Sequence, residues 1–431
     1  MNIREVPSLR VPPGPRIELR GGSVASDIHR LLIKKPGVKS RILTDARAAD
    51  SDASNPESGE SGPPGDGETD TTLLLMSGSW YPENAYMSLL STALRDVGVE
   101  VKTPSLPVFF PLTRTVFANP DADAVQIDWL YNYYVTTDSR SAAFDRLLTY
   151  LRAAAFLVDV AIVSMLDINI VRTVHNKRHH ERLFPRVERV VAEAVFAAAD
   201  AVTVKCDAAT EIIAAEYTVP DADELYVVPD GSYVDAYEND VSRPAARRDL
   251  GMDEETFVYL FFGLIRPYKG VPELIDAFAA LDLPDTELWI VGNPHTEELR
   301  EEIAGRAADV DGVETELAFV PDDRIQYYMN AADVLALPYR DVLNSGTAYL
   351  GISYGIPTVA PRIGCLPEVL SPDRAFLYDR TREGALQEAL HTAYDHPDID
   401  GVREANAEYA RKLTWTPAAE TLRALYRRAS E

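Results

Sequence analysis

The segment FFGLIRPYKGVPELIDAF (residues 261–278) joins an apolar run, a glycine, two cations and the start of an amphipathic pattern. The apolar run ends at Gly263, Arg266 and Lys269 follow around a proline, and apolar residues then recur at helical spacing. A helix N-terminus presents partial positive charge and unpaired N–H groups, so this turn suits an anionic group such as a diphosphate. The alternative interpretation is a solvated surface turn that carries two cations.

Strands and helices of the same kind alternate on both sides of this segment. In the second half, strands are predicted at 258–263, 287–292, 316–320, 334–338 and 357–361, with helices at 271–281 and 296–307. In the first half, strands are predicted at 73–76, 99–101, 124–127, 169–174, 201–204 and 224–228, with apolar helices between them. The pattern predicts an α/β protein with two doubly wound parallel sheets, whose ligands bind in the cleft between the domains.

Composition divides the chain into four parts. Residues 45–70 are rich in Asp, Ser, Gly and Pro, which is typical of a disordered linker. The preceding 44 residues are basic and Pro-rich, and the sequence leaves their role open. We therefore expect a tail and linker at 1–70, domains at 71–230 and 245–405, and at 406–431 a C-terminal helix that crosses back to the first domain.

The charge of the chain limits its partners. With 68 acidic and 42 basic residues, the net charge is -26, which disfavours binding to nucleic acid phosphates. The composition resembles that of proteins from salt-loving archaea, and the alternative is an ordinary acidic protein. The two cysteines, Cys206 and Cys365, form neither a metal spacing nor a disulfide framework, which is typical of a reducing cytoplasm. No signal peptide and no uncharged apolar run of membrane-spanning length is found, so we expect a cytoplasmic protein.

A second candidate anion site lies at AADVLALPYRDVLNSGTAYLGISYGIPTVAP, residues 331–361. A strand leads into a polar loop, and a helix then starts at Asn344, Ser345, Gly346 and Thr347. Taken alone, such a turn is an ordinary helix N-cap. Beside Arg266 and Lys269, it forms one half of a predicted cradle for phosphate.

These motifs together resemble the GT-B glycosyltransferases of the large retaining family 4. The resemblance rests on G-x-x-R-x-x-K-G at 263–270, A-D-V-L-A-L-P-Y at 332–339, G-I-P-T-V-A at 355–360 and L-P-E-V-L at 366–370. Upstream, T-V-H-N at 173–176 followed by His180 and Glu181, and Asn84 with Tyr86, resemble elements of exopolysaccharide glycosyltransferases. The resemblance implies a GT-B fold with two Rossmann-like domains. It also implies a nucleotide-sugar site formed by Gly263, Arg266, Lys269, Asn344, Ser345, Gly346, Thr347 and Glu368, where Glu368 is either a ligand or a helix N-terminal residue.

The chain departs from that family at its paired glutamates. The positions of the E-x7-E element hold Val342 and Leu350, which weakens the expectation of retaining chemistry. In the first domain, Gln126-Ile127-Asp128-Trp129 stands where relatives often read H-x-H-W. Asp128 is then a candidate general base at a strand end facing the cleft, as inverting chemistry requires, or else a capping residue. His175 is a candidate to contact the sugar or the leaving diphosphate, or else a structural histidine.

The expected reaction is transfer of a hexose-type sugar from a UDP- or GDP-linked donor to a glycan or polyprenyl-linked acceptor. We expect no cofactor and no metal, because Asp121-Ala122-Asp123 precedes a predicted strand instead of following one. Two alternatives stay open. One is an inert nucleotide-sugar-binding paralogue that acts as a partner subunit, and the other is a hydrolysing sugar-nucleotide epimerase of GT-B type.

A further helix, predicted within residues 141–166, suggests where the acceptor is located. It places Phe144, Leu147, Leu148, Leu151, Phe156 and Leu157 on one stripe, with Arg146 and Arg152 among them. Such a face can enter a membrane interface while arginine stems reach toward phosphates, which predicts a peripheral membrane contact. The alternative is that the stripe only packs on the sheet.

Overall fold

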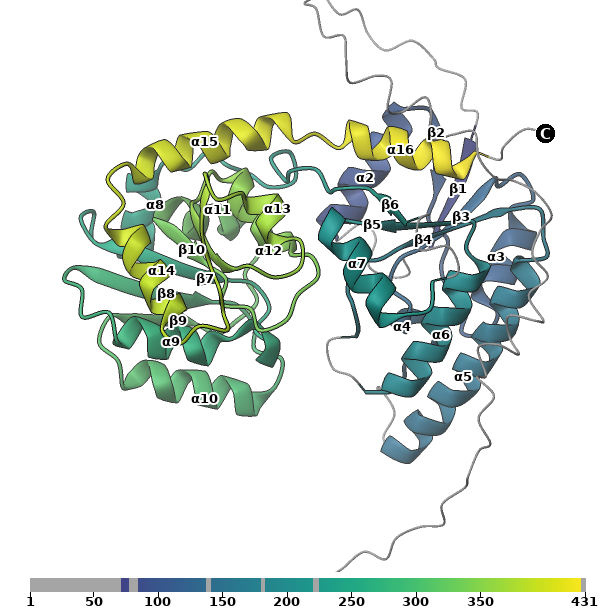
Figure 1. Ribbon diagram of the computed structural model, residues 1–431, viewed down its shortest axis with the longest axis horizontal. Helices are drawn as coiled ribbons and strands as arrows, with labels where there is room; N and C mark the ends of the chain where they lie inside the picture. Colours follow the sequence, from purple (N-terminus) through teal and green to yellow (C-terminus); the bar gives the residue numbers. More distant parts are fainter. Residues whose placement is uncertain (1–70, 77–83, 137–140, 180–182, 220–224, 428–431) are drawn as a thin grey trace, which may run out of the picture.

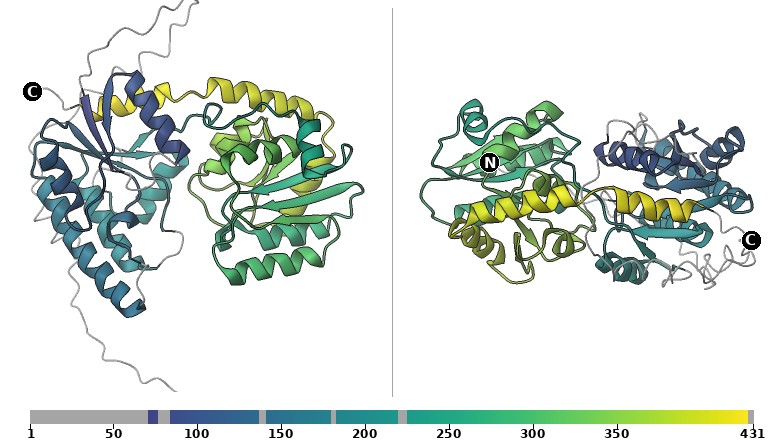
Figure 2. Two further views of the ribbon diagram at one scale, coloured as in Figure 1. Left: turned by 180° about the vertical axis from the view of Figure 1, so that it is seen from behind. Right: turned by 90° about the horizontal axis from the view of Figure 1, so that it is seen from above.

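A computed structural model describes residues 71–76, 84–136, 141–179, 183–219 and 225–427. They form two α/β domains that lie beside each other, each built around a six-stranded sheet (Figures 1 and 2). The predicted tail and linker at 1–70, and the pair His180 and Glu181, lie outside the described residues.

The first sheet is parallel throughout, in the order β2-β1-β3-β4-β5-β6. Its strands are β1 (Thr71–Met76), β2 (Val99–Lys102), β3 (Ala124–Ile127), β4 (Asn169–Thr173), β5 (Ala201–Val204) and β6 (Leu225–Val227). The helices of this domain are α2 (Ala85–Asp96), α3 (Pro111–Ala118), α4 (Tyr131–Tyr134), α5 (Ala142–Val163), α6 (Pro185–Ala198) and α7 (Asp207–Glu216). The central strands are almost entirely buried, as expected for a parallel sheet covered on both faces.

The second sheet is also parallel, in the order β12-β11-β10-β7-β8-β9. Its strands are β7 (Phe257–Phe262), β8 (Thr286–Val291), β9 (Val313–Glu316), β10 (Val334–Ala336), β11 (Thr358–Pro361) and β12 (Ala375–Tyr378). Its helices are α8 (Arg243–Leu250), α9 (Val271–Ala279), α10 (Glu297–Ala308), α11 (Asp322–Ala331), α12 (Gly346–Ser353), α13 (Leu366–Leu370) and α14 (Ala385–Tyr394), with a 3-10 turn, η4, at Pro267–Lys269.

The strand order of each sheet reverses at one point, between β1 and β3 in the first and between β7 and β10 in the second. The loops after these strands diverge, and a crevice forms at the carboxyl end of the sheet. The turn at Gly263 follows β7, the loop at Asn344 follows β10, and Asp128 follows β3. Both crevices therefore carry residues that the sequence singled out.

The C-terminal segment connects the domains a second time. Helix α15 (Ile399–Lys412) lies on the second domain, and α16 (Thr416–Tyr426) continues onto the first domain beside α2 (Figures 1 and 2). Between α15 and α16, Trp415 stacks on Tyr233, which lies in the segment that connects β6 of the first domain to α8 of the second. The indole N–H of Trp415 donates to the carbonyl of Ser232 at 2.8 Å. A Cβ at Gly231 would lie 2.4 Å from the Trp415 ring, so glycine is required there.

Two strand predictions in the second half are wrong. The strand expected at 316–320 lies earlier, as β9, and the strand β12 was not predicted. Both are edge strands, and β9 is mostly polar with little burial, so the apolar run that follows it has the stronger strand pattern. Phe319 in that run is 71% exposed.

Candidate functional site

Three predicted donor residues meet at the carboxyl end of β7. Gly263 has φ 109°, and a Cβ there would lie 3.4 Å from Thr347 Oγ1 and 3.6 Å from Lys269 Nζ. A side chain at this position would therefore fill the space that the hydroxyl and the ammonium group share. This is the close backbone approach that a phosphate site needs.

Lys269 is a buried cation, only 9% exposed. Its ammonium lies over the rings of Tyr339 and Phe261, 5.5 and 5.9 Å from their centroids. Across the described ranges, it has neither a carboxylate nor a hydrogen-bond partner. Because a buried charge is costly unless it is paired, an anion is the partner that this environment favours.

The two loops of the second domain are joined at their backbones. Gly270, with φ 70°, lies against the end of β10, and a Cβ there would be 2.2 Å from the carbonyl oxygen of Pro338. The N–H of Arg340 donates to the carbonyl of Tyr268 at 2.7 Å. The turn of Arg266 and the loop that leads to α12 are therefore in direct backbone contact.

The start of α12 is fixed by Ser345. Its hydroxyl accepts a hydrogen bond from the N–H of Ala348 at 3.3 Å and contacts the Tyr339 hydroxyl, so it caps the helix. Gly346 faces Tyr233, since a Cβ there would lie 3.4 Å from its hydroxyl oxygen. Ser345 thus positions the helix N-terminus, and Gly346 and Thr347 are its first residues.

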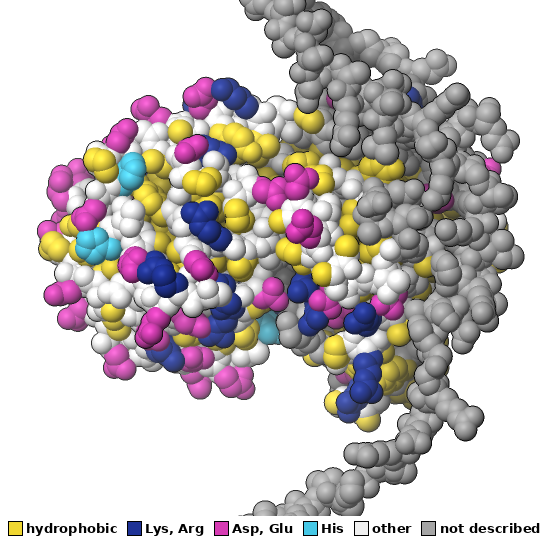
Figure 3. Space-filling view, in the orientation of Figure 1, with side chains coloured by type: hydrophobic (Ala, Val, Ile, Leu, Met, Phe, Trp, Pro, Cys, Tyr) yellow, Lys and Arg dark blue, Asp and Glu magenta, His cyan; other side chains and the backbone are white. Residues whose placement is uncertain are grey.

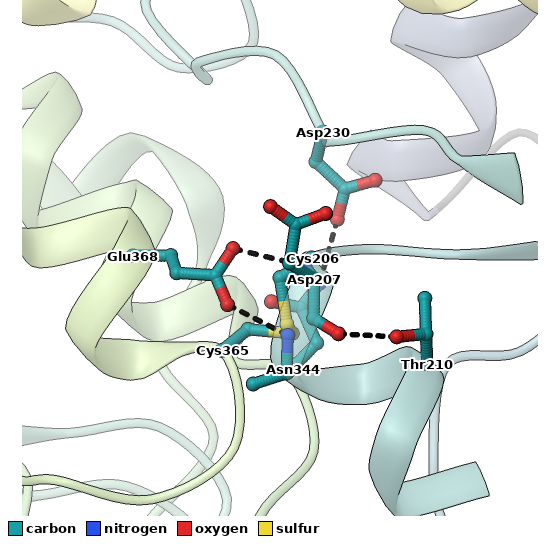
Figure 4. Close-up of a disulfide and its surroundings, with 8 residues drawn as sticks. Cys206, Asp207, Thr210, Asp230, Asn344, Cys365 and Glu368 are labelled. Atoms are coloured by element: carbon teal, nitrogen blue, oxygen red, sulfur yellow. Dashed lines mark hydrogen bonds between the residues drawn. A yellow bond between two sulfur atoms is a disulfide. The ribbon is translucent and has the colours of Figure 1, made fainter. Parts of the chain in front are cut away.

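Asn344 and Glu368 contact the first domain. The Asn344 amide donates to Asp230 at 2.9 Å, and the Glu368 carboxylate accepts from the N–H groups of Asp207 and Ala208 at 2.9 and 2.8 Å (Figure 4). These N–H groups belong to the first two residues of α7, so a carboxylate of one domain caps a helix of the other. Glu368 itself lies in the first turn of α13, and its carboxylate is directed to the start of α7 in this structure.

The expectation that the cysteines stay unpaired is wrong. Cys206 and Cys365 form a disulfide between the domains, with their Cα atoms 5.5 Å apart (Figure 4). Their separation of 159 residues gave no sign of contact, because only the packing of the two domains brings them together. Next to it, Lys205 and Asp230 form a buried ion pair at 2.7 Å. The disulfide removes the argument for a reducing compartment that the cysteines offered.

The sequence suggests that Asp128 faces the cleft, but in the structure it does not. Its side chain is fully buried, and Oδ1 lies 2.8 Å from Nε2 of His175. His175 follows the adjacent strand β4 and covers the carboxylate, with 11% of its own side chain exposed. The two predicted catalytic residues are therefore a hydrogen-bonded pair in which the histidine is nearer to solvent.

The imidazole of His175 is held on both faces. It stacks on Trp129 at 4.6 Å and meets the edge of Tyr86 at 4.7 Å. Burial lowers the pKa of His175 below its ordinary value of 6.5, and the hydrogen bond to Asp128 counters this only in part. The ring is therefore neutral near pH 7. Because the Asp128 carboxylate accepts a hydrogen bond from Nε2–H, Nδ1 carries the free lone pair.

A cavity of about 590 Å³ lies between the domains. Its charged and titratable lining comes from both of them: Lys177, Arg178, His179, Arg266, His295, Arg340 and Asp341. Figure 3 shows Lys and Arg side chains on both sides of the notch between the domains. Asn176, which follows His175, also lines this cavity. In a chain with a net charge of -26, a cleft rich in cations favours an anionic ligand.

The discounted Asp121-Ala122-Asp123 element lies at the amino end of the first sheet. Asp123 accepts a hydrogen bond from the N–H of Thr72 at 2.8 Å, and Asp121 pairs with Lys102. Within the part of the chain that the structure describes, no three His, Cys, Asp or Glu side chains are grouped so that they could hold a metal ion. Metal independence stays a prediction.

The predicted stripe on α5 divides between two faces. Phe156 is fully buried and stacks on Tyr133, and Arg152 donates to the carbonyls of Asn132 and Val135 inside the domain. The carboxylate of Asp159 caps α3, which joins the two helices. The exposed apolar side chains of α3, α5 and the residues before α3, here called the α3–α5 patch, are Val108, Phe109, Phe117, Phe144, Leu147, Tyr150, Leu151 and Val158.

The sequence reasoning also missed residues that organise the site. Gln126 stands out in the sequence only as a departure from a family motif, and Tyr426 and Lys205 belong to no motif. All three are buried polar groups close to Asp128 or to the junction of the domains. Their positions in buried strands and helices look like core positions, so no local signal could have identified them.

Two kinds of sequence relatives were found. Residues 242–413 match a family model described as Glycosyl transferases group 1. Over 130 residues, the chain is 35% identical to a GDP-mannose:glycolipid 4-beta-D-mannosyltransferase of Xanthomonas campestris pv. campestris, covering 30% of this chain and 37% of that protein. Over 219 residues, it is 32% identical to a D-inositol 3-phosphate glycosyltransferase of Corynebacterium glutamicum, covering 48% of this chain and 52% of that protein. The chain thus spans about half or less of these curated relatives.

Solved structures match over both domains. A sucrose-phosphate synthase of Thermosynechococcus elongatus is similar with a TM-score of 0.65 at 17% identity, over 83% of this chain and 98% of that one. Alr3699/HepE of Anabaena, solved in complex with UDP-glucose, gives a TM-score of 0.62 at 17% identity, over 82% and 99% of the two chains. These matches confirm the predicted GT-B fold with two parallel α/β domains.

Proposed function

Because residues 242–413 match the family model of the group 1 glycosyl transferases and the described chain has the GT-B fold, we propose that it transfers a hexose-type sugar from a nucleotide-diphosphate sugar to an acceptor hydroxyl. The observation that carries this proposal is Lys269, a buried ammonium beside Gly263 and Thr347 that has neither a carboxylate nor a hydrogen-bond partner among the described residues. A diphosphate supplies the charge that this position lacks.

The donor lies with its diphosphate between the Gly263 turn and the start of α12. Lys269 and Arg266, with the N-terminal dipole of α12, neutralise the nucleoside diphosphate as it departs. One relative is named for GDP-mannose, which supports guanine as the base of the donor, and uracil is the other expected base. No metal is required in this scheme.

The first domain activates the acceptor. Nδ1 of His175 takes the proton of the acceptor hydroxyl while its oxygen attacks the anomeric carbon. The bond from that carbon to the phosphate oxygen breaks, and the nucleoside diphosphate leaves with the electron pair. Asp128 stabilises the imidazolium ion, which then returns its proton to solvent. This mechanism inverts the anomeric centre, which is consistent with Val342 and Leu350 at the positions of the paired glutamates.

A lipid-linked glycan is the acceptor that the surface favours. No helix among the described residues is long and apolar enough to cross a membrane. The α3–α5 patch carries no exposed carboxylate, because the two acidic residues of α5, Asp145 and Asp159, are buried, whereas Arg114 and Arg146 are exposed. This face can rest in the headgroup boundary, as a peripheral contact on the cytoplasmic side. In a salt-adapted, acidic protein, high salt weakens the repulsion of the remaining surface.

One assay separates the three possible functions. The purified protein is incubated with GDP- and UDP-hexoses in high salt, with and without a polyprenyl-linked acceptor, and nucleoside diphosphate release is measured. We expect release that depends on the acceptor and a product of inverted configuration. Release without acceptor would indicate a hydrolysing epimerase, and binding without release would indicate an inert paralogue.

A further inference from the structure

Buried side chains connect the C-terminal helix to the histidine of the first domain. The hydroxyl of Tyr426, on α16, donates to Oε1 of Gln126. The amide nitrogen of Gln126 donates to both oxygens of Asp128, at 3.1 and 3.2 Å, and Asp128 contacts His175. Tyr426, Gln126 and Asp128 are each fully or almost fully buried. A residue 300 positions away in the sequence thus belongs to the surroundings of the candidate base.

The direction of every hydrogen bond in this series is determined. Gln126 and Asp128 are two residues apart at the end of β3, so their side chains lie on the same face. An ionised carboxylate only accepts hydrogen bonds, so the Gln126 amide must turn its NH2 group toward Asp128. Its oxygen then faces Tyr426, which must donate. Burial raises the pKa of Tyr426 well above 10, so the hydroxyl keeps the proton that it donates.

We propose that Tyr426 is a positioning residue for the transfer reaction: its hydroxyl fixes the Gln126 amide, which aligns the Asp128 carboxylate with Nε2 of His175 and leaves Nδ1 for the acceptor. This inference rests on the proposed role of His175 as the base. It makes α16, which reaches the first domain only after crossing from the second, a part of the acceptor site. The helix is held there because the Asn169 amide donates to the carbonyl of Tyr426 at 3.0 Å.

The other charged groups around His175 do not depend on Tyr426. Lys205 and Asp230 form their own pair at the ends of β5 and β6. Arg172 of β4 donates to the carbonyl of Ile127 at 2.9 Å, and burial lowers its pKa to about 10. Removal of the Tyr426 hydroxyl therefore acts on His175 through Gln126 and Asp128.

The test compares Tyr426→Phe with Tyr259→Phe. Tyr259 is a buried tyrosine of the second domain whose hydroxyl donates to the carbonyl of Leu390 at 2.8 Å, so both variants lose one buried hydrogen bond. We expect Tyr426→Phe to lower kcat roughly 10-fold, the upper end of what one hydrogen bond between neutral groups contributes, with an unchanged donor KM. Because an aligned Asp128 raises the pKa of His175, the acidic limb of the kcat profile should move to lower pH. Tyr259→Phe should keep both kcat and the profile.

Three outcomes separate an error in the role of Tyr426 from an error in the role of His175. Equal kcat in the two tyrosine variants, or an unmoved acidic limb in Tyr426→Phe, overturns the positioning role. If His175→Ala keeps full activity, the proposed base itself is wrong, whatever Tyr426 does. Gln126→Met, which keeps the volume and removes the amide, should reproduce the Tyr426→Phe profile. If circular dichroism shows that Tyr426→Phe does not fold, Gln126→Met tests the same hydrogen-bonded series in its place.

Discussion

The two walls of the cleft are built in different ways. On the second domain, the residues that favour phosphate lie in two short segments that directly follow β7 and β10, and glycines at Gly263 and Gly270 make the approach possible. On the first domain, the candidate base is His175, which depends on Asp128, 47 residues earlier, and on Tyr426 from the last helix. Anion binding relies on local backbone geometry, whereas the orientation of a base relies on tertiary contacts.

The largest expected effect is on the first-domain wall. His175→Ala should lower kcat by roughly 100- to 10,000-fold, the usual contribution of general base catalysis, and leave nucleotide binding unchanged. Because the neutral imidazole is the active form, wild-type kcat should fall as the pH drops through the pKa of His175, which burial places below 6.5. Steady-state kinetics from pH 5 to 8 and calorimetry with the nucleoside diphosphate measure both.

His391→Ala is the control for this substitution, because that histidine pairs with Asp395 on the exposed surface of α14. Near wild-type activity in His175→Ala would contradict the role of the first domain as the source of the base, since this domain would then bind the acceptor without activating it.

The next effect concerns the donor wall. Lys269→Ala should lower kcat/KM by roughly 10- to 1000-fold, because the leaving diphosphate loses one preorganised cation. In contrast to His175→Ala, it should also weaken nucleoside diphosphate binding. The matched control is Lys412→Ala, an exposed lysine that pairs with Glu408. If nucleotide affinity is unchanged in Lys269→Ala, Lys269 is not part of the phosphate site.

The difference between local geometry in the second domain and tertiary contacts in the first determines which features the sequence could predict. The strand β7, the glycine turn and the start of α12 were predictable, because each is a local pattern of apolar run, turn residue and helix cap. Asp128 and His175 were predicted as separate candidates, and their pairing was not. The roles of Gln126 and Tyr426 were invisible, since a buried glutamine or tyrosine in a strand or helix has no local signature. Glu368 and Asn344 were placed at the donor by motif, and only the packing of the domains showed their contacts with α7 and Asp230.

A smaller effect is expected at the membrane. The double variant Phe144→Ser, Leu147→Ser removes two apolar side chains that are each 56% exposed on α5, and should reduce binding to anionic vesicles roughly 10-fold in co-sedimentation. Phe319→Ser, which removes a 71% exposed side chain of the second domain, is the control. Equal vesicle binding of both variants would show that the α3–α5 patch is not the membrane-contacting surface. Turnover on a water-soluble acceptor should be unaffected in either variant.

The smallest effect on turnover is expected at the covalent link between the walls. The double variant Cys206→Ser, Cys365→Ser removes the disulfide but leaves the contacts of Glu368 with α7 and of Lys205 and Asn344 with Asp230. Closure of a loop of this length corresponds to about 5 kcal/mol in the chain-entropy model, which is an upper limit, so Tm should fall clearly. The remaining contacts still set how the domains face each other, so kcat should change by less than roughly 3-fold. Calorimetry and initial rates on oxidised wild type, reduced wild type and the variant measure both quantities. A large loss of kcat with unchanged nucleotide binding would mean that the disulfide itself sets the distance between the donor wall and His175.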